Sequence, residues 1–296
     1  MEKKLIESKD SLCNISKMTY SVGYKEPFIR IKYLSFYRLY FTKALQYRGA
    51  ALAGVFMQFS WGFMQLLMYR AFYLSGNGDL PMDYTSLASY IWLQQALVCL
   101  FMISLIENDT FTAIINGDIA YELCRPINLY YMWFTRNLAN RMARTLLRCF
   151  PIILIAFVMP RPFKMNAPYN LTALVWFLIS TLLGTLVVVA FGMLIYIATF
   201  YTLSPIGVKI VAVAILEFFS GSVVPLPFLP DQLRRIIELL PFAAMPNTPL
   251  LIYSGYIAQS EIFFKTFLQL FWLTILTLLG HLLLRKALRQ VVVQGG

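Results

Sequence analysis

The stretch ENDTFTAIINGDIAYELCRPINLY, residues 107–130, is a polar interval between two long apolar runs. Gly117 interrupts a first helical piece, and Asp118 can begin a second because its carboxylate can accept hydrogen bonds from the free N–H groups of a helix start. Pro126 ends this second piece, since the residue before a proline is pushed out of helical geometry. The stretch therefore predicts a capped helix of about two turns, from Asp118 to Arg125.

Ile119 and Leu123 lie four residues apart on this predicted helix and so share one face. A short helix with an apolar face, held between two membrane spans, suits docking into another protein. The alternative interpretation is a loop that only joins the two spans. Composition and the rest of the chain bear on this choice.

The composition is that of a membrane protein. The 296 residues are 59% hydrophobic and only 13% charged, and the mean hydropathy is +0.66, whereas soluble domains are about 25% charged. Apolar stretches of about 20 residues recur, which is the length that crosses a hydrocarbon core of about 30 Å. The net charge of +11 gathers at the ends of these stretches. That placement indicates membrane anchoring rather than binding to nucleic acid.

We predict an all-α, polytopic membrane protein with six transmembrane helices. The predicted spans are residues 50–72, 84–106, 133–159, 171–195, 205–223 and 262–284. An even number of spans puts both termini on one side. Basic residues before the first span and after the last (Arg285, Lys286 and Arg289) identify that side as the cytoplasm.

The ends of the chain divide into short segments around this predicted six-span core, residues 49–290. We expect residues 1–24 to form a cytoplasmic segment, since they lack the apolar core of a signal peptide, and residues 291–296 to form a cytoplasmic tail. Residues 25–48 are basic and aromatic, and they predict an amphipathic helix lying in the membrane interface with its rings toward the acyl chains.

Residues 221–255 lie between the fifth and sixth spans and contain six prolines. No regular span survives that density, because each proline removes a hydrogen-bond donor. Asp231 can cap a short amphipathic helix in the middle. Broken apolar backbone must be sheltered by protein or line a cavity, so we predict a re-entrant outer segment that covers the mouth of the bundle.

Polar side chains inside spans are rare and usually face a bundle interior or a transport pathway. The candidates here are Gln58, Gln65, Gln94, Gln95, Arg141, Arg144, Arg148 and Glu217. Arg136, Arg141 and Arg144 can extend toward the inner membrane surface. Arg148 lies deeper, so we predict an ion pair with Glu217. A direct contact between Arg148 and a transported substrate is the alternative.

The sequence contains no evident catalytic constellation. A single histidine and four scattered cysteines exclude histidine-based metal clusters, so no metal site and no catalytic residue are predicted. The chain has no G-x-x-x-x-G-K-[ST] loop, so it cannot bind ATP in the P-loop manner.

Four features together resemble the six-span permease subunits of bacterial ATP-binding-cassette (ABC) exporters, the type-2 ABC permease family. They are the basic helix at residues 25–48, the segment INGDIAYELCRPINLYY at 115–131, the segment FFSGSVVPLPFLPDQLRRIIELLPF at 218–242, and a short basic tail. The resemblance covers nearly the whole chain, and the order and spacing of these features carry it.

The resemblance implies a non-enzymatic exporter permease in the bacterial cell membrane, paired with a second permease subunit, like or unlike. A cytoplasmic ABC ATPase dimer would supply ATP and Mg²⁺, with no cofactor bound directly by this chain. The segment that would couple to the ATPase contains Asp118, Ile119, Tyr121, Glu122, Leu123 and Arg125.

Other classes of function stay open at this point. The chain could be a polysaccharide- or lipid-exporting permease, an importing permease, or a non-transporting immunity or sensor protein. An intramembrane enzyme would need several reactive groups at one depth, and only Arg148 and Glu217 meet that condition.

Overall fold

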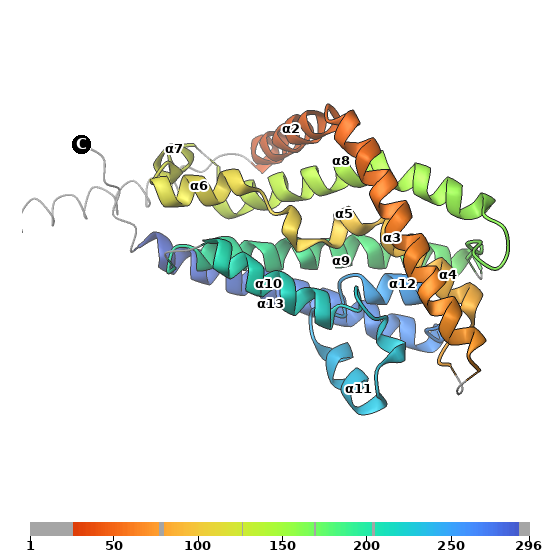
Figure 1. The fold of residues 1–296 in the computed structure, drawn as a ribbon. Helices are drawn as coiled ribbons and strands as arrows, with labels where there is room; N and C mark the ends of the chain where they lie inside the picture. Colours follow the sequence, from red (N-terminus) through yellow and green to blue (C-terminus); the bar gives the residue numbers. More distant parts are fainter. Residues whose placement is uncertain (1–25, 77–79, 126, 169, 203–204, 290–296) are drawn as a thin grey trace, which may run out of the picture.

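The computed structural model describes residues 26–76, 80–125, 127–168, 170–202 and 205–289, and the regular elements in this part of the chain are all helices, with no strand. Long helices lie side by side as a bundle, with the small helices α6 (Asn108–Asn116) and α7 (Ile119–Leu123) at one end and α11 (Asp231–Leu239) toward the other (Figure 1). The predicted all-α class is confirmed.

The bundle is built around three long helices, α8 (Leu129–Val158), α9 (Leu171–Ala198) and α13 (Gln259–Leu288). Helix α9 packs along α13, and the buried helix α12 (Asn247–Tyr253) packs against α9. Asn128 and Asn170 begin α8 and α9, because each side-chain oxygen accepts backbone N–H groups of the first turn. Helix α9 thus begins at the predicted residue, Leu171, whereas α8 begins at Leu129, before the predicted start at residue 133.

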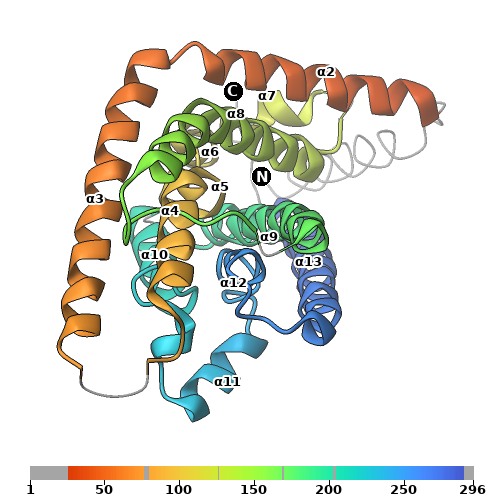
Figure 2. The same ribbon diagram turned by 90° about the vertical axis from the view of Figure 1, so that its right-hand side faces the viewer.

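Helices α2 (Glu26–Leu45) and α3 (Arg48–Leu74) form two sides of a frame around the bundle (Figure 2). Helix α2 packs on α8, and α3 contacts both α8 and α4 (Tyr84–Ala96). The Tyr33 ring lies 6.2 Å from the ring of Tyr131, and Phe36 packs against the buried core. These two rings of α2 therefore face protein. The prediction that they point toward acyl chains is wrong for these residues, because α8 offers a closer apolar surface.

Three of the described helices, α3, α9 and α13, are long and apolar enough to cross a membrane. The other three predicted spans do not correspond to single helices that are both long and apolar enough, and the reasons can be identified. Four arginines lower the hydropathy of α8, and α10 (Pro205–Phe219) has only 15 residues. The predicted span at residues 84–106 is divided into α4, α5 (Val98–Phe101) and the 3₁₀ turn η1 (Ile103–Leu105).

Arg141 of α8 explains how the chain tolerates that division. Its side chain is buried, and its Nη1 donates to the carbonyl oxygens of Leu100 and Met102 at 2.9 and 2.8 Å. Its Nε donates to Oδ1 of Asn137 at 2.6 Å. Backbone carbonyls freed by a helix break in apolar surroundings need such partners. Arg141 is thus part of the helix-break structure.

The segment at residues 221–255 is broken as predicted, into η2 (Leu226–Phe228), α11 and α12. Pro230, rather than Asp231, precedes α11, and no side-chain cap forms; the predicted Asp231 cap is wrong because its carboxylate pairs with Arg234 at 2.8 Å. All seven residues of α12 are buried. Gln269 of α13 donates to the carbonyl of Ala244 at 2.7 Å, which satisfies part of the broken backbone.

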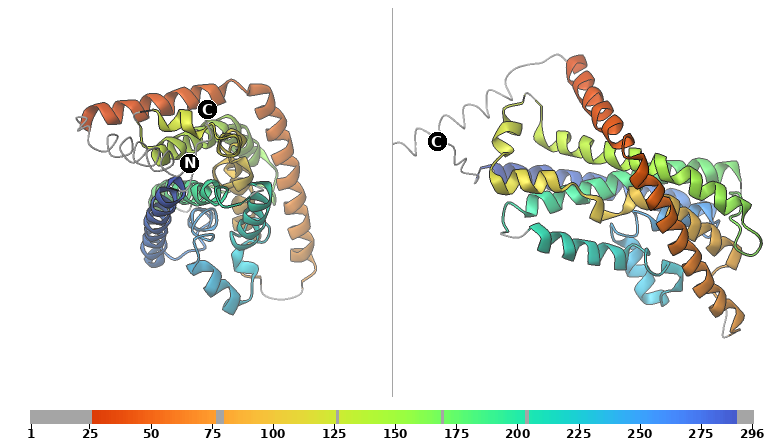
Figure 3. Two further views of the ribbon diagram at one scale, coloured as in Figure 1. Left: turned by 90° about the vertical axis from the view of Figure 1, so that its left-hand side faces the viewer. Right: turned by 45° about the horizontal axis from the view of Figure 1, so that its top comes forward.

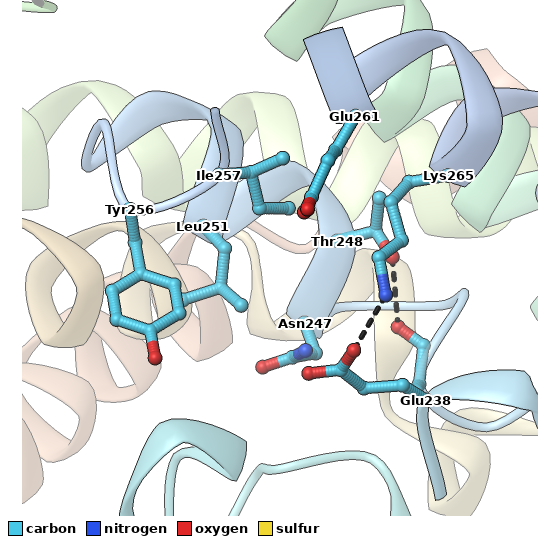
Figure 4. Close-up of a pocket in the computed structure, with 9 residues that line it drawn as sticks. Glu238, Asn247, Thr248, Leu251, Tyr256, Ile257, Glu261 and Lys265 are labelled. Carbon is cyan, nitrogen blue, oxygen red and sulfur yellow. Dashed lines mark hydrogen bonds and ion pairs between the residues drawn. The ribbon is translucent and has the colours of Figure 1, made fainter. Parts of the chain in front are cut away.

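A hollow separates α11, α12 and the start of α13 (Figure 4). An ion pair of 2.5 Å between Lys265 and Glu238 crosses it. Asn247 and Thr248 line it beside Glu261. The ion pair joins α11 to α13, so it helps to hold the broken segment on the bundle.

We predict that Arg141→Met destabilises the protein by on the order of 3 kcal/mol, because two buried carbonyl oxygens lose charge-assisted hydrogen bonds. Thermal unfolding of the purified chain in detergent, followed by tryptophan fluorescence, measures the effect. Arg235→Met is the matched control, because Arg235 is exposed on α11. Equal melting temperatures for the two variants would contradict this role of Arg141.

Candidate functional site

The end of the bundle that carries α6 and α7 presents an apolar tip. Gly117 separates the two helices with φ 80°, the left-handed conformation that glycine adopts without strain. Tyr121 is 76% exposed and Ile115 59% exposed, and Leu123 is also exposed. These three side chains, Ile115, Tyr121 and Leu123, are called the tip residues below.

The predicted geometry of this tip needs three corrections. Helix α7 has five residues rather than about two turns, and Asp118 makes no side-chain cap hydrogen bond because its backbone is already helical, with φ −62° and ψ −10°. Ile119 is 1% exposed and belongs to the buried core. Ile119 therefore anchors the tip, while Tyr121 and Leu123 are the accessible apolar side chains of α7.

Arg136 of α8 ties both ends of this segment to the bundle. Its Nε lies 3.1 Å from Oε2 of Glu107, and its Nη1 lies 3.2 Å from Oε1 of Glu122. Its Nη2 donates to Oγ1 of Thr110 in α6. Because the side chains of Arg136 and both glutamates are at most 17% exposed, these charges depend strongly on one another.

Aromatic residues complete this polar cluster. Trp133 Nε1 donates to Oε2 of Glu122 at 2.6 Å. The Tyr196 hydroxyl of α9 accepts the backbone N–H of Glu107 at 3.0 Å. The Tyr40 ring of α2 lies 5.8 Å from the guanidinium carbon of Arg136, within cation–π distance. The latch, defined as Arg136 with Glu107, Glu122, Thr110 and Trp133, thus connects the tip with α2, α8 and α9.

The electrostatics of the latch depend on Arg136. Burial raises the pKa of Glu107, and the neighbouring Arg136 guanidinium acts in the opposite direction. Removal of the guanidinium would raise this pKa further and favour the neutral carboxyl group. Lys209 of α10 adds a further connection to the segment, through a 3.2 Å hydrogen bond to Oδ1 of Asn108.

The sequence did not identify the latch. It assigned Arg136 to the membrane surface and treated Glu107 as one acid of a polar interval. The available signal was an arginine and a tryptophan three residues apart at the start of a span, following an interval with acids near both ends. Pairing across that interval required the fold.

The predicted pathway residues do not converge on one place. Gln95 donates to Gln65 at 3.1 Å, which joins α4 to α3, and Gln94 donates to the carbonyl of Ser222 at 2.5 Å. Gln58 is partly buried on α3. Arg141 serves the helix break, as described above. The pathway interpretation of these residues stays a prediction.

The predicted ion pair between Arg148 and Glu217 is wrong for the described part of the chain, where no ion pair joins them. The Arg148 guanidinium instead lies against Gly54 of α3, and its Nη2 lies 3.5 Å from the carbonyl oxygen of Ala50. Glu217 is partly buried on α10. Estimating depth along each helix could not show which neighbour each side chain faces.

The described residues contain no group of three or more His, Cys, Asp or Glu side chains arranged to hold a metal ion. Of the predicted coupling residues, Glu122 belongs to the latch, Ile119 to the core, and Tyr121 and Leu123 to the exposed tip. Arg125 is exposed beyond the end of α7. The exposed tip is therefore a surface that the latch and the buried Ile119 fix to the bundle.

We predict that Arg136→Gln loosens the tip, because Glu107 and Glu122 lose their shared cation. Amide hydrogen exchange in α6 and α7 should become about tenfold faster or more, corresponding to a loss of local stability of about 1.4 kcal/mol or more. Arg235→Gln removes the same charge from an exposed position on α11 and should leave this exchange unchanged. Equal exchange in both variants would show that the latch does not hold the tip.

Comparison with known proteins agrees with this architecture. The family model described as ABC-2 family transporter protein matches residues 59–295, which include α4 to α13 and hence the tip and the latch. No curated protein matches the chain. A match over this much of the chain establishes the family, and the protein belongs to the ABC-2 transporter family, as a membrane component of transport.

Proposed function

We propose that this chain is the permease subunit of an ABC exporter that moves a substrate across the bacterial cell membrane with ATP hydrolysed by a separate subunit. The observation that carries the proposal is the apolar tip held by the latch. An exposed aromatic residue on a firmly tied, one-turn helix suits a cleft in a partner, since interface cores are enriched in aromatic residues.

The partner in this proposal is a cytoplasmic ABC ATPase dimer, which binds ATP and Mg²⁺. Movement of the ATPase would push on the tip residues. Arg136 would transmit that movement into α8, and Tyr196 into α9, because both contact the segment directly. From α8 the movement reaches the helix break at Leu97–Met102 through Arg141. A break between short helices can change geometry more easily than a continuous helix.

The proposed topology has six membrane crossings, with α4, α5 and η1 together forming the second. Both termini and the tip lie in the cytoplasm, and residues 221–255 form a re-entrant segment on the outer side. Buried α12 supports re-entry, because it returns into the bundle beside α9. A second permease subunit, identical or different, completes the transporter. The views in Figure 3 show α3 standing at the outside of the bundle, where lipid or that subunit would meet it.

We predict that Tyr121→Asp and Leu123→Asp uncouple ATP hydrolysis from transport while the protein stays folded, because both side chains are exposed. Burying one carboxylate in an apolar interface should weaken ATPase binding about tenfold or more. Substrate-stimulated ATPase activity of the reconstituted complex is the measurement. Tyr201→Asp is the matched control, since Tyr201 is 50% exposed just after α9.

Unchanged stimulation in both tip variants would contradict the proposed ATPase contact. Failure of any ATPase to bind the unmodified chain would instead favour a non-transporting membrane protein. Ile119→Asp is unsuitable for this experiment, because a carboxylate at a fully buried position would disrupt the segment itself.

We predict that single cysteines at Gln232 or Arg235, both exposed on α11, react with an impermeant thiol reagent added outside intact cells. The background variant lacks Cys13, Cys99, Cys124 and Cys149. A cysteine at Tyr121 should react only after the membrane is opened. The reverse pattern of labelling would overturn the proposed orientation.

A further inference from the structure

Three arginines of α8 form a basic stripe that the latch does not use. Arg141, Arg144 and Arg148 recur at intervals of three and four residues and therefore share one face of the helix, over about 10 Å. Within the described part of the chain, no ion pair joins any of them to a carboxylate. Glu107, which interacts electrostatically with Arg144, is already paired with Arg136 at 3.1 Å.

Several donors of this stripe are left without an acceptor. Nη2 of Arg141 and Nε of Arg148 are buried and have no hydrogen-bond partner among the described residues, and the same holds for Nδ2 of Asn137. Arg141 is 1% exposed and Asn137 is 3% exposed. Buried cations and donors are normally paired. The cluster therefore has the composition of a site for an anionic group.

Helix α8 passes beside the corner where α2 turns into α3 (Figure 1). Arg148 approaches Ala50 and Gly54, at the start of α3. A Cβ at position 54 would lie 2.4 Å from the guanidinium carbon of Arg148, so a larger residue there would push the flexible end of Arg148 aside. Arg48 is exposed at the same end of α3 and adds a fourth positive charge.

Exposed apolar side chains of α3 and α8 surround the stripe on the surface of the bundle. Leu146 and Phe150 of α8 are 44% and 67% exposed, and Phe56 of α3 is 75% exposed. In the proposed topology, on which this placement rests, α2 lies near the inner membrane surface, and these side chains meet acyl chains. A ligand that contacts both the arginines and these apolar side chains has an anionic head and an apolar tail.

We propose that Arg144 and Arg148, supported by Arg141, bind the phosphate or carboxylate head of an anionic amphiphile at the corner of α2, α3 and α8. The head group supplies the counter-charge that the described carboxylates do not, through charge-assisted hydrogen bonds. The tail lies along the exposed apolar side chains of α3 and α8. The ligand is a membrane lipid or a substrate of the same chemistry.

The test uses the full-length chain in neutral detergent, with native mass spectrometry to count bound ligand. Phosphatidylglycerol, phosphatidylcholine and inorganic phosphate are the probes. The unmodified protein should retain phosphatidylglycerol in preference to phosphatidylcholine. Arg144→Met with Arg148→Met should reduce retention about tenfold or more, whereas lysine at both positions should keep much of it. Arg235→Met, which removes an exposed charge on α11, should match the unmodified protein.

Equal retention of the two lipids, or undiminished retention in the double methionine variant, would overturn the proposal. Displacement of phosphatidylglycerol by equimolar inorganic phosphate would also overturn it, because the site would then bind a free anion without the tail. If the double variant does not fold, Gly54→Leu provides the second test, since it displaces the Arg148 guanidinium and should weaken retention. The experiment needs no ATPase, so its failure leaves the proposed permease function intact.

Discussion

Buried backbone polar groups need hydrogen-bond partners, and α8 supplies them for several of its neighbours. The chain is apolar enough to belong in a bilayer, yet its second apolar run is broken and its segment at residues 221–255 contains six prolines. Arg141 supplies donors to the first break, and Gln269 of α13 supplies one to the second. Without these side chains, freed carbonyls would face apolar groups.

Arginines at three positions along α8 therefore make three different kinds of contact. Arg136 holds α6 and α7, Arg141 holds the broken helix, and Arg148 lies against the start of α3. This arrangement gives a physical route from the tip to the interior, because the contacts are charge-assisted and directional. In the proposed mechanism, a displacement of the tip is transmitted by these contacts rather than by the apolar packing alone.

Several of the polar residues that the sequence grouped as pathway candidates make identifiable structural contacts. Gln65 and Gln95 join two helices, Gln94 supports the turn after α10, and Arg148 does not meet Glu217. Shared helical spacing identifies side chains on one face of one helix. It contains no information about which neighbouring helix that face meets, and this is why the predicted pair was wrong.

The sequence by itself determined the helical class, the membrane composition, the break at Gly117 and the irregular segment rich in proline, because these follow from local backbone geometry and hydropathy. It also identified residues 107–130 as a polar interval between two apolar runs. Only the tertiary structure decided that Ile119 is buried while Tyr121 is exposed, and that Arg136 pairs with Glu107 and Glu122. It also decided that Tyr33 of α2 packs on α8. Those outcomes depend on which helix faces meet, and residues far apart in the chain determine that together.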